Sequence, residues 1–489
     1  MQTPSSSFFL FPRRGAALAV TLACSVLVVG CSHTTQLAQQ GRAVAVPAQW
    51  HASGAQPQPT PPDDLSQWWQ RFGDAQLTGL IEQALAANPS VLSAQAAVRQ
   101  ARAQRDVQVA GTLPSVNLGG SAQRSRQGNN GANNRFGVNV DAGWEPDWWG
   151  TQANALQASE ANVAAAQASL EGAYVSLAAE VALSYVELRN LQQRLVIAQR
   201  NLAIQRETQQ ITEWRVQAGL ATSLDSEQAR QSTAQTAAQV PALQSSLAQS
   251  RHALAVLTGQ TPETLEAVLA SVAAVPQAPA ALAMALPADT LRQRPDVRVQ
   301  ERKVDAALAN LSAQERANYP SLRLNGSLGL SALTLGALTN GASVAASLAA
   351  SLSAPLFDGG ANRAQIRSQE EAVAQARLGL QSTVLAALQE VEDALVQLQG
   401  DRDRLVQLQV AQEAAANAAL LARQRYSSGL IDFQTVLDTQ RTELSTQDSV
   451  AQAQAAISAD HIRLYKALGG GWQPQAAAEA HVSAPSAQP

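Results

Sequence analysis

The sequence predicts an α+β protein: an internally duplicated, elongated protomer with long coiled-coil helical hairpins and two β-hairpins. Three observations lead to this fold class. Landmarks recur at a nearly fixed spacing, as in proteins built from a repeated unit. Several segments alternate apolar and polar residues with a period of two, which indicates strands. Two long segments carry apolar residues at alternating spacings of three and four, which indicates helices packed side by side.

The first element is an export signal over residues 1–30. Arg13 and Arg14 form a positive n-region, residues 16–29 an apolar h-region, and Gly30 is a small residue before Cys31. The h-region is too short for a permanent membrane helix. Residues 28–31 resemble a bacterial lipobox, so we expect Cys31 to be acylated and to become the mature N-terminus. The alternative is that Cys31 is not acylated and only happens to follow an ordinary signal-peptide cleavage site.

Residues 31–74 follow as a lipid-anchored N-terminal tether. Residues 32–64 have little periodicity and are rich in Gln, Ala and Pro, which is typical of an extended linker. With Cys24 removed and Cys31 modified, no disulfide is expected. No other segment has eighteen uninterrupted apolar residues, so we expect no transmembrane helix in the mature chain and no cofactor besides the lipid on Cys31.

Two repeats make up the body, at residues 75–258 and 287–468, with a Pro-containing connection at 259–286 and a flexible tail at 469–489. Each repeat contains a helix, a β-hairpin (about 114–148 and 320–357) and a helical hairpin that turns near Gly219 or Gly429. The landmarks that return 206 to 210 residues later are Asn88-Pro89-Ser90-Val91 as Arg294-Pro295-Asp296-Val297, Leu113-Pro114 as Tyr319-Pro320, and Gly150 as Gly360. Such a duplication fits two halves of a channel wall or a helical array without a pore.

The strands alternate most clearly in residues 136–144, 322–330 and 343–352. Apolar residues such as Val138, Val140, Val344 and Leu348 take every second position. This pattern suits a membrane β-barrel with lipid outside and water inside, and it also suits a half-buried soluble sheet. The lipoprotein signal and the lack of a helical span favour the membrane. Four strands cannot close a barrel, and open edges are costly in lipid, so membrane strands would require an oligomer.

The helices of the hairpins carry heptad patterns. The segment from Gly150 to Gly219 would be on the order of 100 Å long at 1.5 Å per residue. Pro241 lies inside the first returning helix and is expected to kink or divide it. The apolar heptad positions are Leu170, Tyr174, Leu177, Val181, Leu188, Leu191, Leu195 and Leu202 in the first repeat, and Val384, Leu388, Val391, Leu395, Leu398 and Leu405 in the second, with Arg402 as the exception.

Composition argues against nucleic-acid binding and against catalysis. The net charge is −4 and only two lysines occur, so no basic surface is expected to neutralise phosphates. The five histidines are scattered, and no metal-ligand spacing, phosphate-binding loop or nucleophile motif is present. Arg294-Pro295-Asp296 is best explained as a helix start, with proline at the first helical position. We therefore expect no enzyme activity.

Several motifs together resemble the TolC-like outer-membrane factor family, in particular its lipoprotein branch that serves RND-type multidrug efflux systems. The motifs are Trp68-Trp69-Gln70-Arg71-Phe72-Gly73-Asp74, Leu291-Arg292-Gln293-Arg294-Pro295-Asp296-Val297, Pro355-Leu356-Phe357-Asp358-Gly359-Gly360, and residues 425–441. The resemblance implies a homotrimer with a twelve-stranded barrel in the outer membrane and a periplasmic α-helical tunnel. It also implies a periplasmic adaptor and an inner-membrane pump as partners, and export of small molecules across the outer membrane.

The candidate gate and adaptor-docking residues lie at the helical turns: Arg215, Gly219, Arg425, Gly429 and Asp432. In a closed trimer, three copies of Asp432 would lie near one axis, where a ring of carboxylates selects cations or forms a gate. Arg425 is near enough in sequence to pair with Asp432. Asp432 is also a good N-cap residue, so capping alone is the alternative.

Two other functions remain open. A polypeptide export duct would use the same kind of tunnel. A periplasmic adaptor lipoprotein also contains a coiled-coil hairpin, but normally one hairpin flanked by a split β-domain, whereas the hairpins here are duplicated.

Overall fold

The computed structural model describes residues 46–47, 49–51, 65–126, 128, 131–279 and 287–471, with the backbone alone for residues 287–289. The export signal, Cys31 and most of the segment before residue 65 lie outside this part of the chain. All described residues belong to one compact unit.

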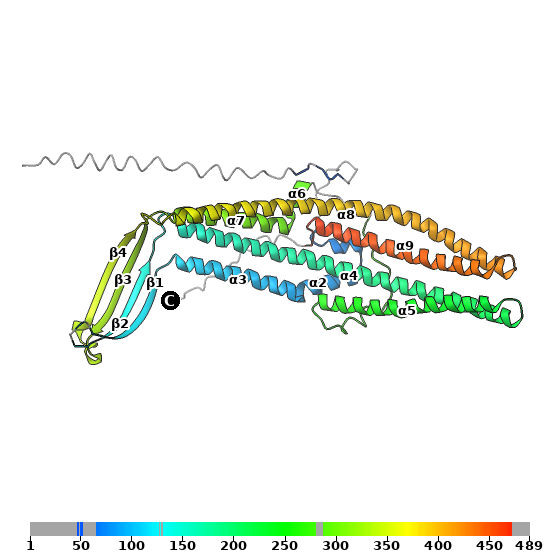
Figure 1. Cartoon of the computed structure of the whole chain (residues 1–489), viewed down its shortest axis with the longest axis horizontal. Coiled ribbons are helices and arrows are strands. Elements are labelled where there is room, and N and C mark those ends of the chain that lie inside the picture. Colours follow the sequence, from blue (N-terminus) through cyan, green and yellow to red (C-terminus); the bar gives the residue numbers. More distant parts are fainter. Residues whose placement is uncertain are drawn as a thin grey trace, which may run out of the picture. The chain divides into compact units, whose positions relative to one another are not determined.

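Two series of elements follow each other along the chain (Figure 1). The first series contains η3 (Trp68–Phe72), α2 (Ala75–Ala87), α3 (Pro89–Gly111), β1 (Ser115–Ser125), β2 (Asn133–Trp144), α4 (Thr151–Gln217) and α5 (Ser223–Leu257). The second contains α6 (Pro287–Gln293), α7 (Pro295–Arg316), β3 (Ser321–Ala332), η4 (Leu335–Ala337), η5 (Gly341–Ser343), β4 (Val344–Ser353), α8 (Ala361–Ser427) and α9 (Phe433–Ala467). Each repeat therefore contains a helix, a β-hairpin and a helical hairpin.

The helical hairpins of the two repeats match in length. Helices α4 and α8 each have 67 residues, and α5 and α9 each have 35. At 1.5 Å per residue, α4 and α8 are each about 100 Å long. The two hairpins are thus built to the same dimensions.

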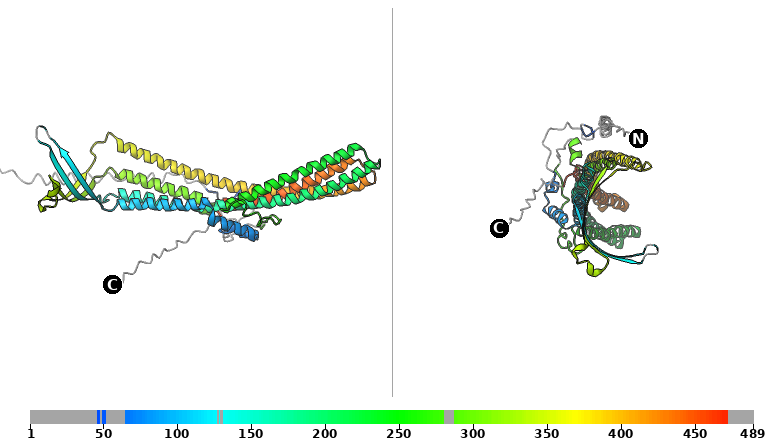
Figure 2. Two further views of the ribbon diagram at one scale, coloured as in Figure 1. Left: turned by 90° about the horizontal axis from the view of Figure 1, so that it is seen from below. Right: turned by 90° about the vertical axis from the view of Figure 1, so that its left-hand side faces the viewer.

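The long helices form one layer that is four helices wide (Figures 1 and 2). Near the strands, α3, α4, α7 and α8 lie side by side in this order. Towards the helical turns, α5 continues in the place of α3 and α9 in the place of α7. Of the helices in the described part of the chain, only α4 and α8 run through both halves, which explains why their heptad patterns are the longest.

The heptad positions named above are buried or half-buried in the structure, including Arg402. The guanidinium of Arg402 lies 3.1 Å from Nε2 of His461 on α9. The charged residue in this heptad position of α8 therefore faces a polar partner on α9, not an apolar one.

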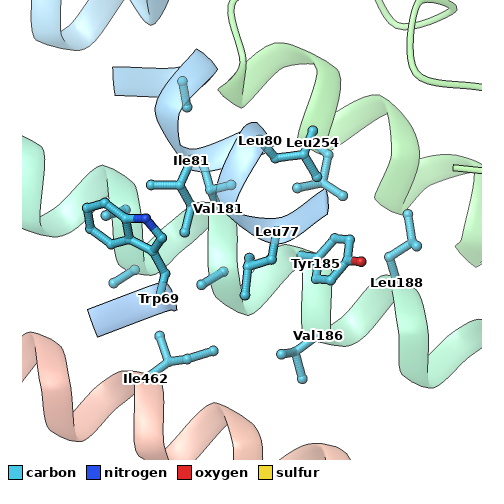
Figure 3. Close-up of a cluster of buried hydrophobic side chains, with 14 of the residues drawn as sticks. Trp69, Leu77, Leu80, Ile81, Val181, Tyr185, Val186, Leu188, Leu254 and Ile462 are labelled. Carbon is cyan, nitrogen blue, oxygen red and sulfur yellow. The ribbon is translucent and has the colours of Figure 1, made fainter. Parts of the chain in front are cut away.

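A central core lies where α2, α4, α5 and α9 meet (Figure 3). Leu77, Ile81, Val181, Leu254 and Ile462 pack there from these four helices. A hydrogen-bonded polar group lies inside the core: the Tyr185 hydroxyl donates to Asp74 Oδ2 at 2.8 Å and accepts from Arg189 Nη2 at 2.8 Å.

Both ends of the body differ from the boundaries that the sequence suggests. Trp68, Trp69 and Phe72 are buried in the core, so the expected tether over residues 31–74 must end before residue 65. Gly471 donates its backbone N–H to the Leu65 carbonyl oxygen at 2.9 Å, so the expected tail from residue 469 begins too early. These short segments lack periodicity because they are held by tertiary contacts and not by a long helix.

Pro241 was expected to kink or divide its helix, and the structure shows that it does not divide it. Helix α5 continues from Ser223 to Leu257. Buried residues occur on both sides of the proline, with Thr233 and Thr236 before it and Leu247 and Leu254 after it. Packing on both flanks thus outweighs the lost helical hydrogen bond.

Arg294-Pro295-Asp296 begins α7, as expected for a helix start. Pro295 takes the first helical position. The buried Arg294 guanidinium binds Asp296 at 2.7 Å, Glu390 at 2.8 Å and the Ala467 carbonyl oxygen at 2.7 Å. This arginine ties the start of α7 to α8 and to the end of α9.

The four strands form one antiparallel sheet in the order β1-β2-β3-β4. In this register, directly opposed residues share a face, and the large apolar side chains fall on the same side. Typical rows are Leu118–Val140–Leu328–Ala346 and Gly120–Val138–Leu330–Val344 on one face, and Asn117–Asp141–Ser327–Ser347 on the other. The sheet therefore has one apolar and one polar face.

The apolar face is uncovered in the protomer. Leu348 is 87% exposed and Val344 56%, and none of the long helices packs against the sheet. Strands β1 and β4 each pair with one strand in the described part of the chain, so two edges are free. A soluble sheet would need a covering layer that the described chain does not provide.

Candidate functional site

The helical turns lie at the end of the helices far from the strands (Figure 1). Their backbones are nearly identical. In the first turn, Leu220 N–H donates to the Arg215 carbonyl at 2.8 Å, and in the second, Leu430 N–H donates to the Arg425 carbonyl at 2.9 Å. Gly219 and Gly429 have φ of 74° and 71°. These are Schellman C-caps, in which glycine takes the left-handed conformation without steric cost.

The returning helices begin with side-chain caps. Asp432 is the N-cap of α9, and its Oδ1 accepts from Thr435 N–H at 2.8 Å and from the Thr435 hydroxyl at 2.6 Å. These two hydrogen bonds, first that of the hydroxyl, hold the pKa of Asp432 below its usual range. The corresponding α5 begins with a capping box between Thr222 and Asp225. The capping interpretation of Asp432 is therefore confirmed, and its carboxylate is also charged and exposed.

Arg215 connects the two turns. Its guanidinium carbon lies 4.5 Å from the centroid of the Tyr426 ring, and its Nη1 donates to the Tyr426 carbonyl at 3.5 Å. Burial is the main cause that raises the pKa of Tyr426. Tyr426 also lies 5.3 Å from Phe433, centroid to centroid. A cation–π contact of this kind stabilises by ~0.5–2 kcal/mol and couples the first turn to the second.

Of the five predicted turn residues, the structure brings Arg215 and the second turn together, but it does not pair Arg425 with Asp432. Among the described residues, Asp432 forms no ion pair within its own protomer. Arg425 is exposed and contributes its backbone carbonyl to the C-cap. A salt bridge between these two residues is therefore not part of the protomer.

Exposed apolar side chains at the turns were not singled out by the sequence. Leu220 is 71% exposed and Leu430 73%, and each follows the glycine of its turn. Leu224 adds a third exposed apolar side chain at the start of α5. An apolar residue directly after each C-cap glycine was the available signal. These three side chains are apolar contact points at the helical turns.

The polar face of the sheet is the second part of the site. Asn139 donates to Asp141 within β2, and the Ser327 and Ser347 hydroxyls lie 2.8 Å apart across β3 and β4. At the end of this face nearest the helices, Arg323 pairs with Glu145 at 3.1 Å. This face carries hydroxyl, amide and carboxylate groups in rows, as a water-filled lumen requires.

The described residues provide no metal centre, because no group of three or more His, Cys, Asp or Glu side chains is placed to share an ion. Within the same residues, no helix has the length and hydropathy to cross a bilayer.

Comparison with known proteins identifies relatives over most of the chain. A family model described as "Outer membrane efflux protein" matches residues 80–260 and 286–470. The chain is 31% identical to the pyoverdine export outer membrane protein OpmQ of Pseudomonas putida, over 92% of this chain and 97% of OpmQ. It is 27% identical to the probable outer membrane lipoprotein SilC of Salmonella typhimurium, over 83% and 88% of the two chains.

The fold is also similar to solved structures. The outer-membrane channel OprN superposes with a TM-score of 0.82 at 35% identity, and the match covers 88% of this chain and 98% of the OprN chain. The two segments matched by the family model each contain one β-hairpin and one helical hairpin.

Proposed function

The chain belongs to the outer membrane efflux protein family, and from this premise we propose that three copies assemble into one continuous duct. The protein is an outer-membrane exit duct of a tripartite efflux system, as its homologues are. The resemblance that the sequence motifs suggested is thereby confirmed. The assembly, its partners and the roles of single residues are the subject of the proposal.

One observation carries the proposal: the sheet exposes an apolar face and two free edges. Backbone groups at an open edge cost several kcal/mol each in lipid, so the sheet can enter a membrane only if β1 and β4 find partners. Pairing β1 of one copy with β4 of the next satisfies both edges. Three copies would give a closed barrel of twelve strands with the apolar face towards lipid.

The helical layer supports the tunnel. The layer is four helices wide both near the strands and near the helical turns. Three such layers side by side would therefore form a ring of twelve helices at each of these two levels, and the two rings would have similar diameters. The rings would be continuous with the barrel because α3, α4, α7 and α8 connect directly to the strands.

A periplasmic adaptor would bind at the helical turns, with an inner-membrane pump beyond it. The exposed Leu220 and Leu430 fit the apolar side chains of another helical hairpin, and Arg215 holds the two turns in a fixed relation. Small molecules are the proposed cargo, and the name of OpmQ refers to one such molecule. The alternative cargo is a polypeptide. Deleting the gene and comparing compound sensitivity with that of candidate pump deletions tests the assignment: sensitivity shared with one pump deletion supports it, and loss of protein export alone contradicts it.

Cys31 is the proposed lipid anchor. The relative SilC is named as a lipoprotein, and the tether after Cys31 leads to Trp50, which packs between α8 and α9. Changing Cys31→Ser should abolish metabolic labelling with radioactive palmitate and leave the signal uncleaved at this position. Cys24→Ser is the matched control and should label normally. Undiminished labelling of the Cys31 variant would contradict a lipid on this residue.

Asp432 is the proposed gate residue, in addition to its cap. Its exposed carboxylate would approach two symmetry copies in a closed trimer, where three negative charges favour cations. Changing Asp432→Asn keeps an N-cap side chain and removes the charge. We expect lower cation selectivity, measured as a reversal potential in planar bilayers under a salt gradient, with trimer stability within about 0.5 kcal/mol of wild type.

Asp432→Ala serves as the comparison because it removes both cap and charge. If Asp432→Asn conducts like wild type and only Asp432→Ala loses stability, Asp432 acts as a cap and not as a gate.

A further inference from the structure

A pocket of about 500 Å³ lies at the foot of the sheet, where the strands meet the helices. Leu322 and Leu352, which oppose each other on the apolar face of the sheet, line its upper wall. The β2–α4 connection and the end of α7 form the rest. The pocket therefore opens on the face that the proposed barrel turns to lipid, at its helix-side border.

Aromatic residues give the pocket a fixed wall. Trp149 stacks on Tyr319 with 5.1 Å between ring centroids, and its Nε1 donates to the Pro320 carbonyl at 2.6 Å. Next to them, Trp148 is 74% exposed. Indole rings with an apolar body and a polar edge are enriched where a membrane meets water. The exposed Trp148 and the stacked Trp149–Tyr319 pair therefore suit the border between a membrane and water.

Charges of both signs line the same pocket. Arg316, the last residue of α7, donates from Nη1 to the Trp149 carbonyl at 2.6 Å, which leaves its other guanidinium N–H groups available. Asp147 uses Oδ2 to accept from Ala153 N–H at 2.7 Å, and Oδ1 has no hydrogen-bond partner among the described residues. Glu145 also lines the pocket, and its carboxylate is already paired with Arg323 at 3.1 Å.

From this combination we propose that the pocket binds the headgroup of a zwitterionic phospholipid that carries a primary ammonium, with its acyl chains along the apolar face of the sheet. Arg316 would bind the phosphate, because guanidinium N–H groups match phosphate oxygens. Asp147 would accept from the ammonium through its Oδ1, which has no partner in the described part of the chain. The inference rests on the proposed membrane barrel and adds a specific lipid at its helix-side rim.

Native mass spectrometry of the purified trimer tests the proposal. The protein is reconstituted with equal amounts of phosphatidylethanolamine and phosphatidylglycerol of the same acyl composition, and the retained lipid is counted per trimer. The expected result is at least fivefold more phosphatidylethanolamine than phosphatidylglycerol on wild type, and at least fivefold less of it on Arg316→Gln. Asp147→Asn, which keeps an N-terminal cap for α4, should lower the preference between the two lipids.

Arg135→Gln is the matched control, because Arg135 lies on the polar face of the sheet, at the end far from the pocket. It should retain lipid like wild type. Equal retention of the two lipids, or no effect of Arg316→Gln, overturns the proposal. If Arg316→Gln abolished the trimer while the protomer still bound phosphatidylethanolamine, Arg316 would serve the contact with a neighbouring copy and not the lipid. That result would also overturn the proposal. The same spectra report the mass of the wild-type assembly, so a failure of the trimer itself is seen separately.

Discussion

Placing an arginine at position 140 should prevent assembly of the membrane form. Val140 lies in β2 on the apolar face, between Leu118 of β1 and Leu328 of β3. An arginine at the bilayer midplane on the lipid face costs roughly 2–4 kcal/mol in a membrane barrel. The cost would occur three times in a trimer. We therefore expect Val140→Arg to reduce the amount of trimer extracted from membranes to a small fraction of wild type, measured on a semi-native gel.

Asn139→Arg is the control one residue away on the polar face. Asn139 lies between Gly119 and Gly329, whose missing side chains leave room beside it, and it hydrogen-bonds to Asp141. An arginine there can pair with Asp141 in the lumen, so near-normal assembly is expected. Equal tolerance of both arginines would mean that the apolar face does not contact lipid.

The second large effect concerns a buried acid pair and a histidine between α8 and α9. Asp460 and His461 are 1% and 2% exposed. Burial, and next its hydrogen bond with Asp401, raises the pKa of Asp460 to about 6, against the opposing effect of Arg463. Burial, and next repulsion from Arg402, lowers the pKa of His461 to about 4. Arg404 on α8 also belongs to this cluster, because its Nη1 lies 3.7 Å from Asp401 Oδ1.

These two shifts act on stability with opposite signs. Asp460 favours folding fully below pH 3.8, and this contribution is lost as the pH rises through about 6. His461 favours folding fully above pH 6.5, and this contribution is lost as the pH falls through about 4. Between pH 4 and 6 the two slopes largely cancel in the wild type. Each shift of about 2 units corresponds to roughly 3 kcal/mol.

Removing one group should therefore expose the slope of the other. With Asp460→Asn, the free energy of unfolding should rise by roughly 2–3 kcal/mol per protomer between pH 4 and 6.5. With His461→Gln, it should fall by a similar amount between pH 4 and 6. Denaturant unfolding followed by tryptophan fluorescence at a series of pH values measures both. Parallel, flat profiles for the two variants would show that neither group changes its protonation on folding.

The sequence predicts the repeated elements well where a long period is sustained. Alternation placed Val138, Val140, Val344 and Leu348 on one face, and the register of the sheet agrees. Strand β1 was harder to predict beyond Leu118, because Gly119 and Gly120 interrupt the alternation although they pair normally with β2.

Features held by tertiary contact were not predictable from one sequence. The five-residue η3 is too short for a periodic signal, yet Trp68 in it is fully buried. The contact of Arg215 with Tyr426 joins residues 211 positions apart. Arg294 and Asp296 were correctly placed at a helix start. The sequence did not show that Arg294 also binds Glu390 on α8 and the Ala467 carbonyl on α9.

Disulfide cross-linking between strands β1 and β4 tests the proposed assembly most directly. Asn117 and Ser347 lie on the same face, three strands apart in one protomer, which corresponds to about 14 Å at 4.8 Å per strand. A disulfide requires Cα atoms within about 7 Å, so a bond inside one protomer is excluded. Asn117→Cys combined in turn with cysteine at Ser343, Ala345, Ser347, Ala349 or Ser351 covers the register between copies. A covalently linked trimer from membranes, for at least one pair, is the predicted result; monomers for every pair, in protein that has reached the outer membrane, would contradict a barrel closed by three copies.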